Sequence, residues 1–259
     1  MKAQDEVVRP NPQEVTPMVA IDGLSKWLGE IQVLRDVTLN VGRGEKIVLC
    51  GPSGSGKSTL LRCINGLDEP DRGRIRVDNI EVNPRQPDID EVRPRIGMVF
   101  RHINLFPHLN LADNLLLGPM SAESAERPEL EAKAASLLER VHLGGLMAKF
   151  PAQLSSGQQQ RAAIARALMQ DAKLLLFDAP TAILPPEEAG EVLEVMTEIA
   201  GKDMTMLVVT NEIGFARAVA DLIVYMDRGE IVETAPPAAF LDTPADDRTK
   251  RFVGQLLGH

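Results

Sequence analysis

The chain has 259 residues, of which 44% are hydrophobic, and its formal net charge is −9. This length allows one large hydrophobic core or two closely joined lobes. The acidic balance argues against a broad nucleic-acid surface, which needs clustered cations, so we expect no nucleic-acid partner. The apolar runs are far shorter than the roughly 18 residues that a membrane-spanning helix needs. Residues 1–8 lack the apolar stretch of a secretory signal.

The first third of the chain reads mainly as strands. Residues 1–17 are polar and contain prolines, which predicts a flexible N-terminal arm. Apolar and polar side chains alternate over residues 18–41 and again over residues 74–82, as in half-buried antiparallel strands. Between them, a short apolar run at Ile47–Cys50 predicts a buried strand, and residues 60–64 predict the start of a helix.

The rest of the chain alternates helical and strand-like segments. Helical spacing of apolar residues predicts three helices, at residues 129–141, 158–169 and 187–199. Short apolar runs predict three buried strands, at residues 174–178, 206–210 and 223–227. The predicted fold class is α/β, with a parallel sheet, a small antiparallel sheet from the first third, and a helical insert in the middle.

A glycine-rich segment, G-P-S-G-S-G-K-S-T at residues 51–59, fits the phosphate-binding pattern G-x-x-x-x-G-K-[ST]. Its glycines let consecutive backbone N–H groups converge on phosphate oxygens, and the following helix points its positive end at the anion. The pattern places its lysine at the β and γ phosphates and its following serine at Mg²⁺. The candidate nucleotide-binding residues here are Gly51, Ser53, Gly54, Ser55, Gly56, Lys57, Ser58 and Thr59.

Cys50 and Cys63 flank this segment. Their spacing matches neither a metal site nor a redox motif, so we expect two buried thiols.

A second motif, L-S-S-G-Q at residues 154–158, opens a predicted helix, and an apolar run ending at Asp178 follows it. The order of these three motifs resembles that of the ATP-binding subunits of ABC transporters. Residues 97–108, 214–217 and 249–252 look most like the branch that drives polar amino-acid importers of bacteria. The resemblance runs from about residue 18 to residue 257.

This resemblance implies the P-loop NTPase fold and one ATP-binding domain over residues 18–259. Its nucleotide-binding core would comprise residues 18–100 and 166–240. A helical subdomain would occupy residues 101–165, and a C-terminal helix would occupy residues 241–259.

The resemblance also implies a head-to-tail dimer, with ATP between the phosphate loop of one subunit and the L-S-x-G-Q helix of the other. Ser155, Gly157 and Gln158 would then join the nucleotide site, where free N–H groups at a helix N-terminus favour a γ-phosphate. The implied cofactors are ATP and Mg²⁺, with Ser58 and Asp178 as metal ligands.

The implied partners are integral-membrane permease subunits, a second copy or a second ATPase subunit, and indirectly a periplasmic solute-binding protein. The protein would be peripheral, at the cytoplasmic face of the inner membrane.

Five positions depart from the family pattern. Ala179 stands where the family has the glutamate that polarises the attacking water, and Asn211 stands where it has a switch histidine. Arg101 replaces the glutamine near Mg²⁺. Pro185 replaces an aspartate at the dimer seam, and Leu28 replaces the aromatic residue that stacks on adenine.

Loss of a positioned base removes a factor of about 10² to 10⁴ in rate, so we expect negligible hydrolysis. Binding should suffer less, although the missing base stack weakens it by about 1 to 3 kcal/mol. Trp27 would replace the stack only if its strand were rotated. Arg101 has three alternatives: it repels Mg²⁺, it grips the γ-phosphate, or it turns to solvent.

Two questions stay open from the sequence. Leu105, Phe106, Leu109 and Leu111 either line a groove for the membrane partner or belong to the core of the helical insert. The chain itself is a transporter subunit beside a competent ATPase, a regulator or scaffold that stays closed on ATP, or an ABC ATPase outside transport. The absence of a long coiled-coil insert counts against the last.

Overall fold

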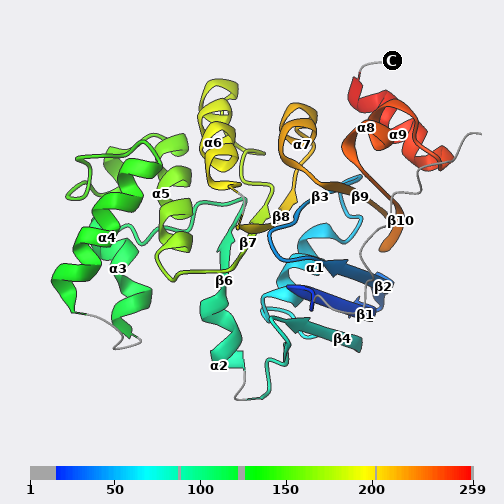
Figure 1. Cartoon of the computed structure of the whole chain (residues 1–259), viewed down its shortest axis with the longest axis horizontal. Helices are drawn as coiled ribbons and strands as arrows, with labels where there is room; N and C mark the ends of the chain where they lie inside the picture. Colours follow the sequence, from blue (N-terminus) through cyan, green and yellow to red (C-terminus); the bar gives the residue numbers. More distant parts are fainter. Residues whose placement is uncertain (1–15, 87–88, 122–125, 202, 258–259) are drawn as a thin grey trace, which may run out of the picture.

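The computed structural model describes residues 16–86, 89–121, 126–201 and 203–257 (Figure 1). The predicted N-terminal arm therefore lies, apart from its last two residues, outside the described part of the chain. In the described ranges no helix is both long enough and apolar enough to cross a bilayer.

The strands form two sheets. A four-stranded antiparallel sheet has the order β2-β1-β4-β5 and contains β1 (Val19–Leu28), β2 (Ile31–Val41), β4 (Arg72–Val77) and β5 (Ile80–Glu81). A six-stranded sheet has the order β10-β9-β3-β8-β7-β6 and contains β3 (Lys46–Cys50), β6 (Ile96–Val99), β7 (Leu174–Asp178), β8 (Thr205–Val209), β9 (Leu222–Asp227) and β10 (Glu230–Ala235). Its strands are parallel except for β10, which pairs with β9 in the antiparallel sense.

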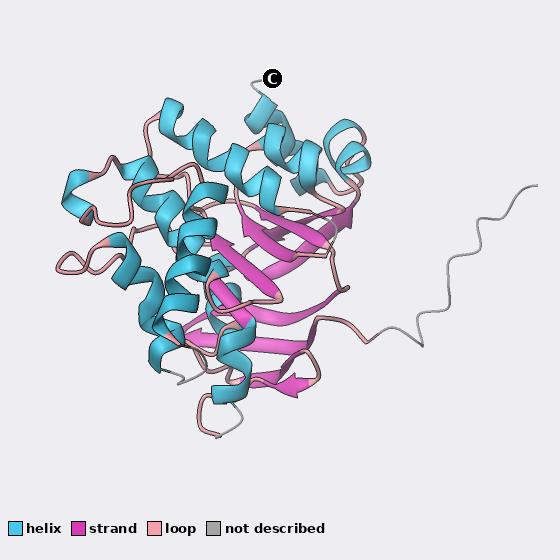
Figure 2. Ribbon diagram, turned by 60° about the vertical axis from the view of Figure 1, so that its left-hand side comes forward, coloured by secondary structure: helices cyan, strands magenta, loops and turns pink. Residues whose placement is uncertain are grey.

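Helices connect the parallel strands, and Figure 2 shows the helices packed around the strands. They are α1 (Lys57–Ile64), α2 (Ile89–Val92), α3 (Leu111–Ser121), α4 (Arg127–Arg140), α5 (Ser156–Leu168), α6 (Pro186–Ile199), α7 (Ile213–Val219), α8 (Pro237–Asp242) and α9 (Asp247–Leu257). Helices α3, α4 and α5 lie together at the end of the molecule opposite the antiparallel sheet (Figure 1).

The parallel strands are buried on both faces, and their alternating side chains feed two cores. In β3, Ile47 and Leu49 join a core shared with α1 and the antiparallel sheet, whereas Val48 and Cys50 join a core shared with the helices. Helix α1 thus packs between the two sheets. This packing fixes the position of the phosphate-binding segment, which leads into the start of α1.

Both thiols are free and buried, as predicted. Burial raises the pKa of Cys50 and of Cys63 to about 12. Neither thiol is therefore a nucleophile at neutral pH.

The predicted fold class is confirmed, but several elements were not predicted. These are β6, β10, α2, α3, α7 and α8. Residues 241–259, predicted as one C-terminal helix, contain the end of α8 and then α9, with a break at residues 243–246. The predicted boundary of the helical subdomain at residue 165 falls inside α5, which continues to Leu168.

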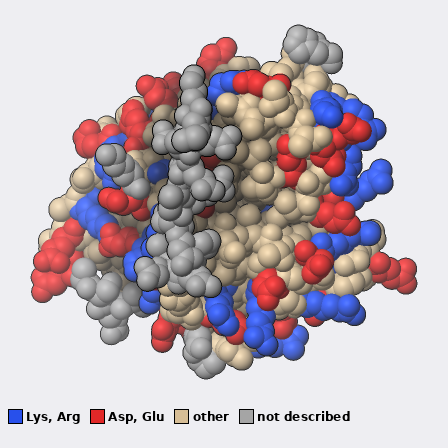
Figure 3. Space-filling view, turned by 45° about the vertical axis from the view of Figure 1, so that its right-hand side comes forward, with Lys and Arg blue, Asp and Glu red and all other residues tan. Residues whose placement is uncertain are grey.

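Lysine, arginine and carboxylate side chains are interspersed on the face drawn in Figure 3, with no field of a single sign.

Candidate nucleotide site and partner groove

The phosphate-binding segment lies between the end of β3 and the start of α1, at the carboxyl edge of the six-stranded sheet. Gly51 and Gly56 have φ values of 143° and 98°, which side chains rarely adopt. A Cβ at Gly51 would lie 2.0 Å from the Met226 carbonyl oxygen, and one at Gly56 would lie 2.6 Å from that of Val33. Only glycine fits these two positions, so the loop geometry depends on them.

Lys57 folds back over the loop. Its Nζ donates to the carbonyl oxygens of Gly51 and Pro52 at 2.9 and 2.7 Å, and to Ser55 Oγ at 2.9 Å. Burial lowers the pKa of Lys57, and the nearby Arg101 guanidinium lowers it further against the opposing charge of Asp178. The ammonium is held in place for an incoming anion, which would remove this electrostatic penalty.

Ser58 and Asp178 meet although they lie on different elements. Ser58 Oγ, in the first turn of α1, donates to Asp178 Oδ1, at the end of β7, at 2.6 Å. A hydroxyl and a carboxylate oxygen are the ligand types that Mg²⁺ takes in phosphate sites. The two residues therefore present a donor set that fits this metal.

Two adjoining cavities surround the loop. One, of about 340 Å³, is lined by the loop and by the ends of β7 and β8. The other, of about 240 Å³, is lined by the loop, the start of α1 and two residues of the antiparallel sheet. Ser53, Lys57 and Arg101 line both. Ser55, Gly56, Ser58 and Thr59 line the second cavity, together with Gly54.

Three of the five positions that depart from the family pattern line the first cavity, and Arg101 is one of them. Ala179 and Asn211 lie there beside Thr210 and Glu212. Ala179 has a φ of 47°, a strained value for a residue with a Cβ, and its N–H donates to the Val209 carbonyl at 3.0 Å. The backbone thus holds residue 179 at the cavity, but its methyl group offers no proton acceptor.

Leu28 is 53% exposed and lines the second cavity with Val33. Trp27 does not line it. The Arg72 guanidinium lies 5.5 Å from the Trp27 ring centroid, a cation–π contact on the antiparallel sheet. The strand rotation that would let Trp27 replace the base stack is not present, so Leu28 is the residue that faces this cavity.

Arg101 follows β6 and is exposed, and it lines both cavities beside Lys57. It has no ion-pair partner within 4.0 Å among the described residues. Arg101 therefore borders the phosphate site and is exposed there, and the three alternatives for its role stay predictions.

The L-S-S-G-Q motif starts α5 and lines neither cavity. Ser155 is the N-cap, and it forms a capping box with Gln158: Gln158 N donates to Ser155 Oγ at 3.3 Å, and Ser155 N donates to Gln158 Oε1 at 3.1 Å. Within one chain the motif does not reach the phosphate loop. A nucleotide between the two would have to join two chains.

The expectation of a free N–H at Gly157 is wrong. Gly157 N and Ser156 Oγ both donate to Glu188 Oε2, each at 2.5 Å. These donors, together with Ser155, hold the pKa of Glu188 below its usual value. An anion of the same chain therefore occupies this helix N-terminus. Pro185, the fifth departure, is the N-cap of α6, three residues before Glu188.

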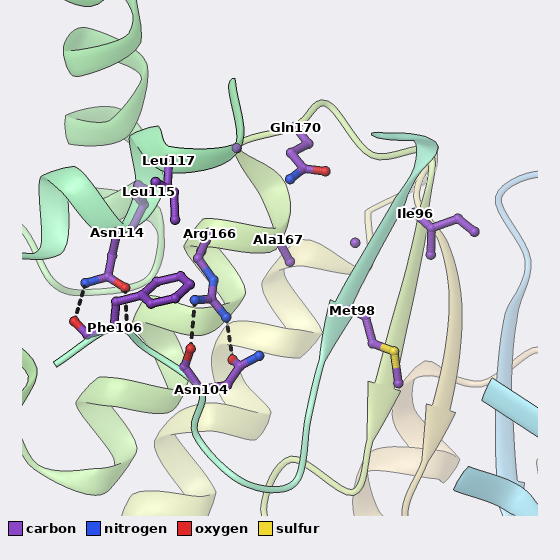
Figure 4. Close-up of a pocket in the computed structure, with 12 residues that line it drawn as sticks. Ile96, Met98, Asn104, Phe106, Asn114, Leu115, Leu117, Arg166, Ala167 and Gln170 are labelled. Carbon is purple, nitrogen blue, oxygen red and sulfur yellow. Dashed lines mark hydrogen bonds between the residues drawn. The ribbon is translucent and has the colours of Figure 1, made fainter. Parts of the chain in front are cut away.

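A separate groove of about 350 Å³ lies between β6, α3 and the second half of α5 (Figure 4). Arg166 reaches into it, and its guanidinium donates to the Asn104 carbonyl at 2.9 Å and to Asn104 Oδ1. It also lies 5.9 Å from the Phe106 ring centroid. Burial lowers the pKa of Arg166, with no carboxylate opposing the shift.

The sequence left open whether Leu105, Phe106, Leu109 and Leu111 line a groove or belong to the core of the helical insert, and the structure gives a different answer for different residues. Phe106 is 40% exposed and lines the groove, whereas Leu105 and Leu111 are buried in the core of the helical part. Leu109 is half-buried and does not line the groove.

Several residues that border these sites were not identified from the sequence, and three of them are polar side chains that bear on the argument. Glu212 and Thr181 line the first cavity, and Glu188 caps α5. The sequence did contain an indication for Glu188. It stands at the third position of a helix that follows Pro185, and an acidic side chain at that position commonly accepts hydrogen bonds from N–H groups at a helix start.

Comparison with known proteins accounts for this combination. A sequence model of the ABC transporter family matches residues 34–182. The glutamate/aspartate import ATP-binding protein GltL of Escherichia coli K12 is 50% identical over 240 residues, which cover 93% of this chain and 100% of GltL. The general L-amino acid transport ATP-binding protein AapP of Rhizobium johnstonii is 50% identical over 239 residues, covering 92% of this chain and 93% of AapP.

The fold also matches a solved structure. A dimeric structure of the ATP-binding cassette MJ0796 in a post-hydrolysis state, bound to ADP and Pi, superposes with a TM-score of 0.76 at 34% identity. The match covers 85% of this chain and 99% of the cassette. The family model matches more than half of the chain and the relatives are about half identical to it, so this chain belongs to the ABC transporter family.

Proposed function

We propose that this chain is the ATP-binding subunit of a bacterial importer for polar amino acids, and that it binds ATP but hydrolyses it negligibly. The observation that carries the proposal is an asymmetry around the phosphate-binding segment. Lys57, Ser58 and Asp178 keep the contacts of a phosphate and metal site. Neither Ala179 nor Asn211, which line the first cavity, has a side chain that can act as a base.

In this proposal the chain's own residues bind and orient the triphosphate. The backbone N–H groups of the loop and the Lys57 ammonium hold the β and γ phosphates. Ser58 Oγ and Asp178 Oδ1, which already lie 2.6 Å apart, would hold Mg²⁺, and the metal would neutralise phosphate charge. Arg101 supplies a second cation on the same side as Lys57.

The proposal includes a dimer, because the two halves of the nucleotide site lie apart within one chain. The L-S-S-G-Q helix lines neither cavity, and the MJ0796 cassette that shares this fold is a dimer. The second subunit would be another copy or a competent ATPase subunit.

The partner in the membrane would be a permease that docks at the groove of Figure 4. GltL and AapP are named as import or transport ATP-binding proteins for amino acids, which supports an importer and a peripheral location at the inner membrane. The groove supports the docking role because it combines an exposed aromatic ring, Phe106, with a part-buried cation, Arg166, that no carboxylate neutralises.

A non-hydrolysing regulator or scaffold is the second candidate function, favoured by the loss of the base alone. A single-turnover assay tests the lack of hydrolysis, on which both candidates depend. The chain is loaded with Mg²⁺ and γ-labelled ATP, and phosphate release is followed with and without a competent amino-acid importer ATPase such as GltL. We expect ATP binding without release by the isolated chain. Sustained release by the isolated chain, lost in Lys57→Ala, would contradict the proposal.

A further inference from the structure

The start of α5 is closed by a carboxylate of the next helix along the chain. Glu188 Oε2 accepts hydrogen bonds from both Ser156 Oγ and Gly157 N, at 2.5 Å each. These are a hydroxyl and a backbone N–H at the positive end of a 13-residue helix, where a phosphate oxygen would be bound in the same way. The carboxylate therefore occupies the place and the donors that an external anion would need.

The local sequence explains why Glu188 caps α5 and not its own helix. In α6 the N-cap is Pro185, so Glu188 is at the third helical position, from which an acidic side chain normally accepts from the N-cap N–H. Proline has no N–H, so that partner is missing. Its Oε2 instead accepts from the donors at the start of α5.

A second contact holds the two helices in this arrangement. One turn further along α6, Glu191 pairs with Arg161 of α5 at 2.9 Å, and the Arg161 guanidinium also donates to the Val141 and His142 carbonyls. The packing is tight where the helices start, because a Cβ at Gly157 would lie 2.8 Å from Glu188 Cβ. Glu188 is thus presented by a braced helix and not by a free loop.

We propose that Glu188 is an internal ligand of the α5 N-terminus that competes with the γ-phosphate of ATP held by a second subunit. This inference rests on the proposed function, since it needs ATP to bring two chains together. It gives the chain an autoinhibitory contact: ATP fills the phosphate loop, but the second half of the composite site opens only when Glu188 leaves Gly157 and Ser156. Two like charges facing the same donors oppose closure of the dimer.

The test is the self-association of the full-length chain with Mg²⁺ and ATP, measured by sedimentation velocity over a range of protein concentrations. Glu188→Gln keeps an oxygen that accepts from Gly157 N but removes the charge. The matched control is Glu187→Gln, which removes the neighbouring exposed carboxylate, one with no hydrogen bond or ion pair among the described residues. ATP binding is measured on the same samples with a fluorescent ATP analogue.

We expect Glu188→Gln to tighten ATP-dependent dimerisation by about tenfold or more, and Glu187→Gln to leave it unchanged. Glu188→Ala, which also removes the cap, should melt at a lower temperature yet dimerise more tightly, a combination that a purely structural role would not give. Unchanged dimerisation in both Glu188 variants, with ATP bound, would overturn this inference alone. Loss of ATP binding in every sample, the unaltered chain included, would overturn the proposed function and this inference with it.

Discussion

The Ser58 hydroxyl donates to Asp178 Oδ1 at 2.6 Å, although 120 residues separate the two in the chain. The pairing requires that β7 end beside the start of α1, which follows from the strand order in which β8 lies between β3 and β7. The next residue after Asp178 is Ala179, so the proposed metal ligand adjoins the position for which the proposal expects no base.

Restoring the base should restore turnover. In the double variant Ala179→Glu with Asn211→His, we expect ATP hydrolysis to rise by about 10² or more over the unaltered chain. Residue 179 already has a φ of 47° as alanine. Glutamate, which like alanine has a Cβ, can adopt this φ at a similar energetic cost. Steady-state phosphate release measures the gain.

Two controls sharpen this test. Ala179→Gln with Asn211→His has the same size but no carboxylate at position 179, and it should stay at background. Lys57→Ala added to the restored variant should abolish turnover, because it removes the phosphate contact. Equal rates in the glutamate and glutamine variants would show that residue 179 is not the missing base.

Arg101 should reduce the dependence of ATP binding on Mg²⁺. It lines both cavities with Lys57 and lowers the pKa of that lysine, so its charge already acts on the phosphate site. We expect chelation of Mg²⁺ to weaken ATP binding of the unaltered chain by no more than about threefold, and that of Arg101→Gln by about tenfold or more. Isothermal titration with and without EDTA gives both values.

Arg74→Gln is the control for a general change of charge, because Arg74 is exposed on β4 and lines neither cavity. It should behave as the unaltered chain does. A large loss of affinity on chelation in the unaltered chain would exclude Arg101 as a substitute for the metal.

Leu28→Tyr should strengthen ATP binding. Leu28 is 53% exposed and faces the second cavity, while Trp27 is held by Arg72 on the antiparallel sheet. A ring at position 28 would stack on the base, which raises affinity by about tenfold. Ile31→Tyr, at an exposed position of β2 outside the cavity, is the control. Equal gains in both variants would point to non-specific aromatic contact.

The sequence predicted the elements with a strong local signal. The phosphate loop, the buried strands and the helices with a clear apolar stripe are where residue type alone decides the structure. Helix α3 was not predicted because its own apolar residues are not confined to one face, so its sequence shows no helical periodicity. Helix α4 begins at Arg127, two residues before the predicted start, because Pro128 is favoured in a first turn.

The candidate site divides in the same way. The residues on the loop were predictable because their spacing is local, and the cavity around Ala179 and Asn211 follows from the strand order. The contact between Gly157 and Glu188 was not predictable, since it depends on how the starts of α5 and α6 pack against each other in space. Because Pro185 has no N–H, the sequence indicates that Glu188 accepts from a group outside its own helix start, but it does not indicate which group.

Asp78 should make stability depend on acid pH. It lies in the turn between β4 and β5, and its side chain, only 8% exposed, accepts from Arg43, Arg95 and Lys173. Burial alone would raise its pKa, but the three cations outweigh this effect and lower the pKa from 3.8 to about 2. The stabilisation is therefore complete above the unfolded pKa of 3.8 and is lost as the pH falls towards 2.

Asp78→Asn should accordingly lower the free energy of unfolding at pH 7 by about 2 kcal/mol, and the difference from the unaltered chain should shrink below pH 4. Asp90→Asn is the matched control, because Asp90 is 83% exposed and makes one long ion pair with Arg93 at 3.7 Å. Urea unfolding at pH 7, 4 and 3 measures both. A difference that stays constant across these pH values would mean that Asp78 acts through the shape of the turn and not through its charge.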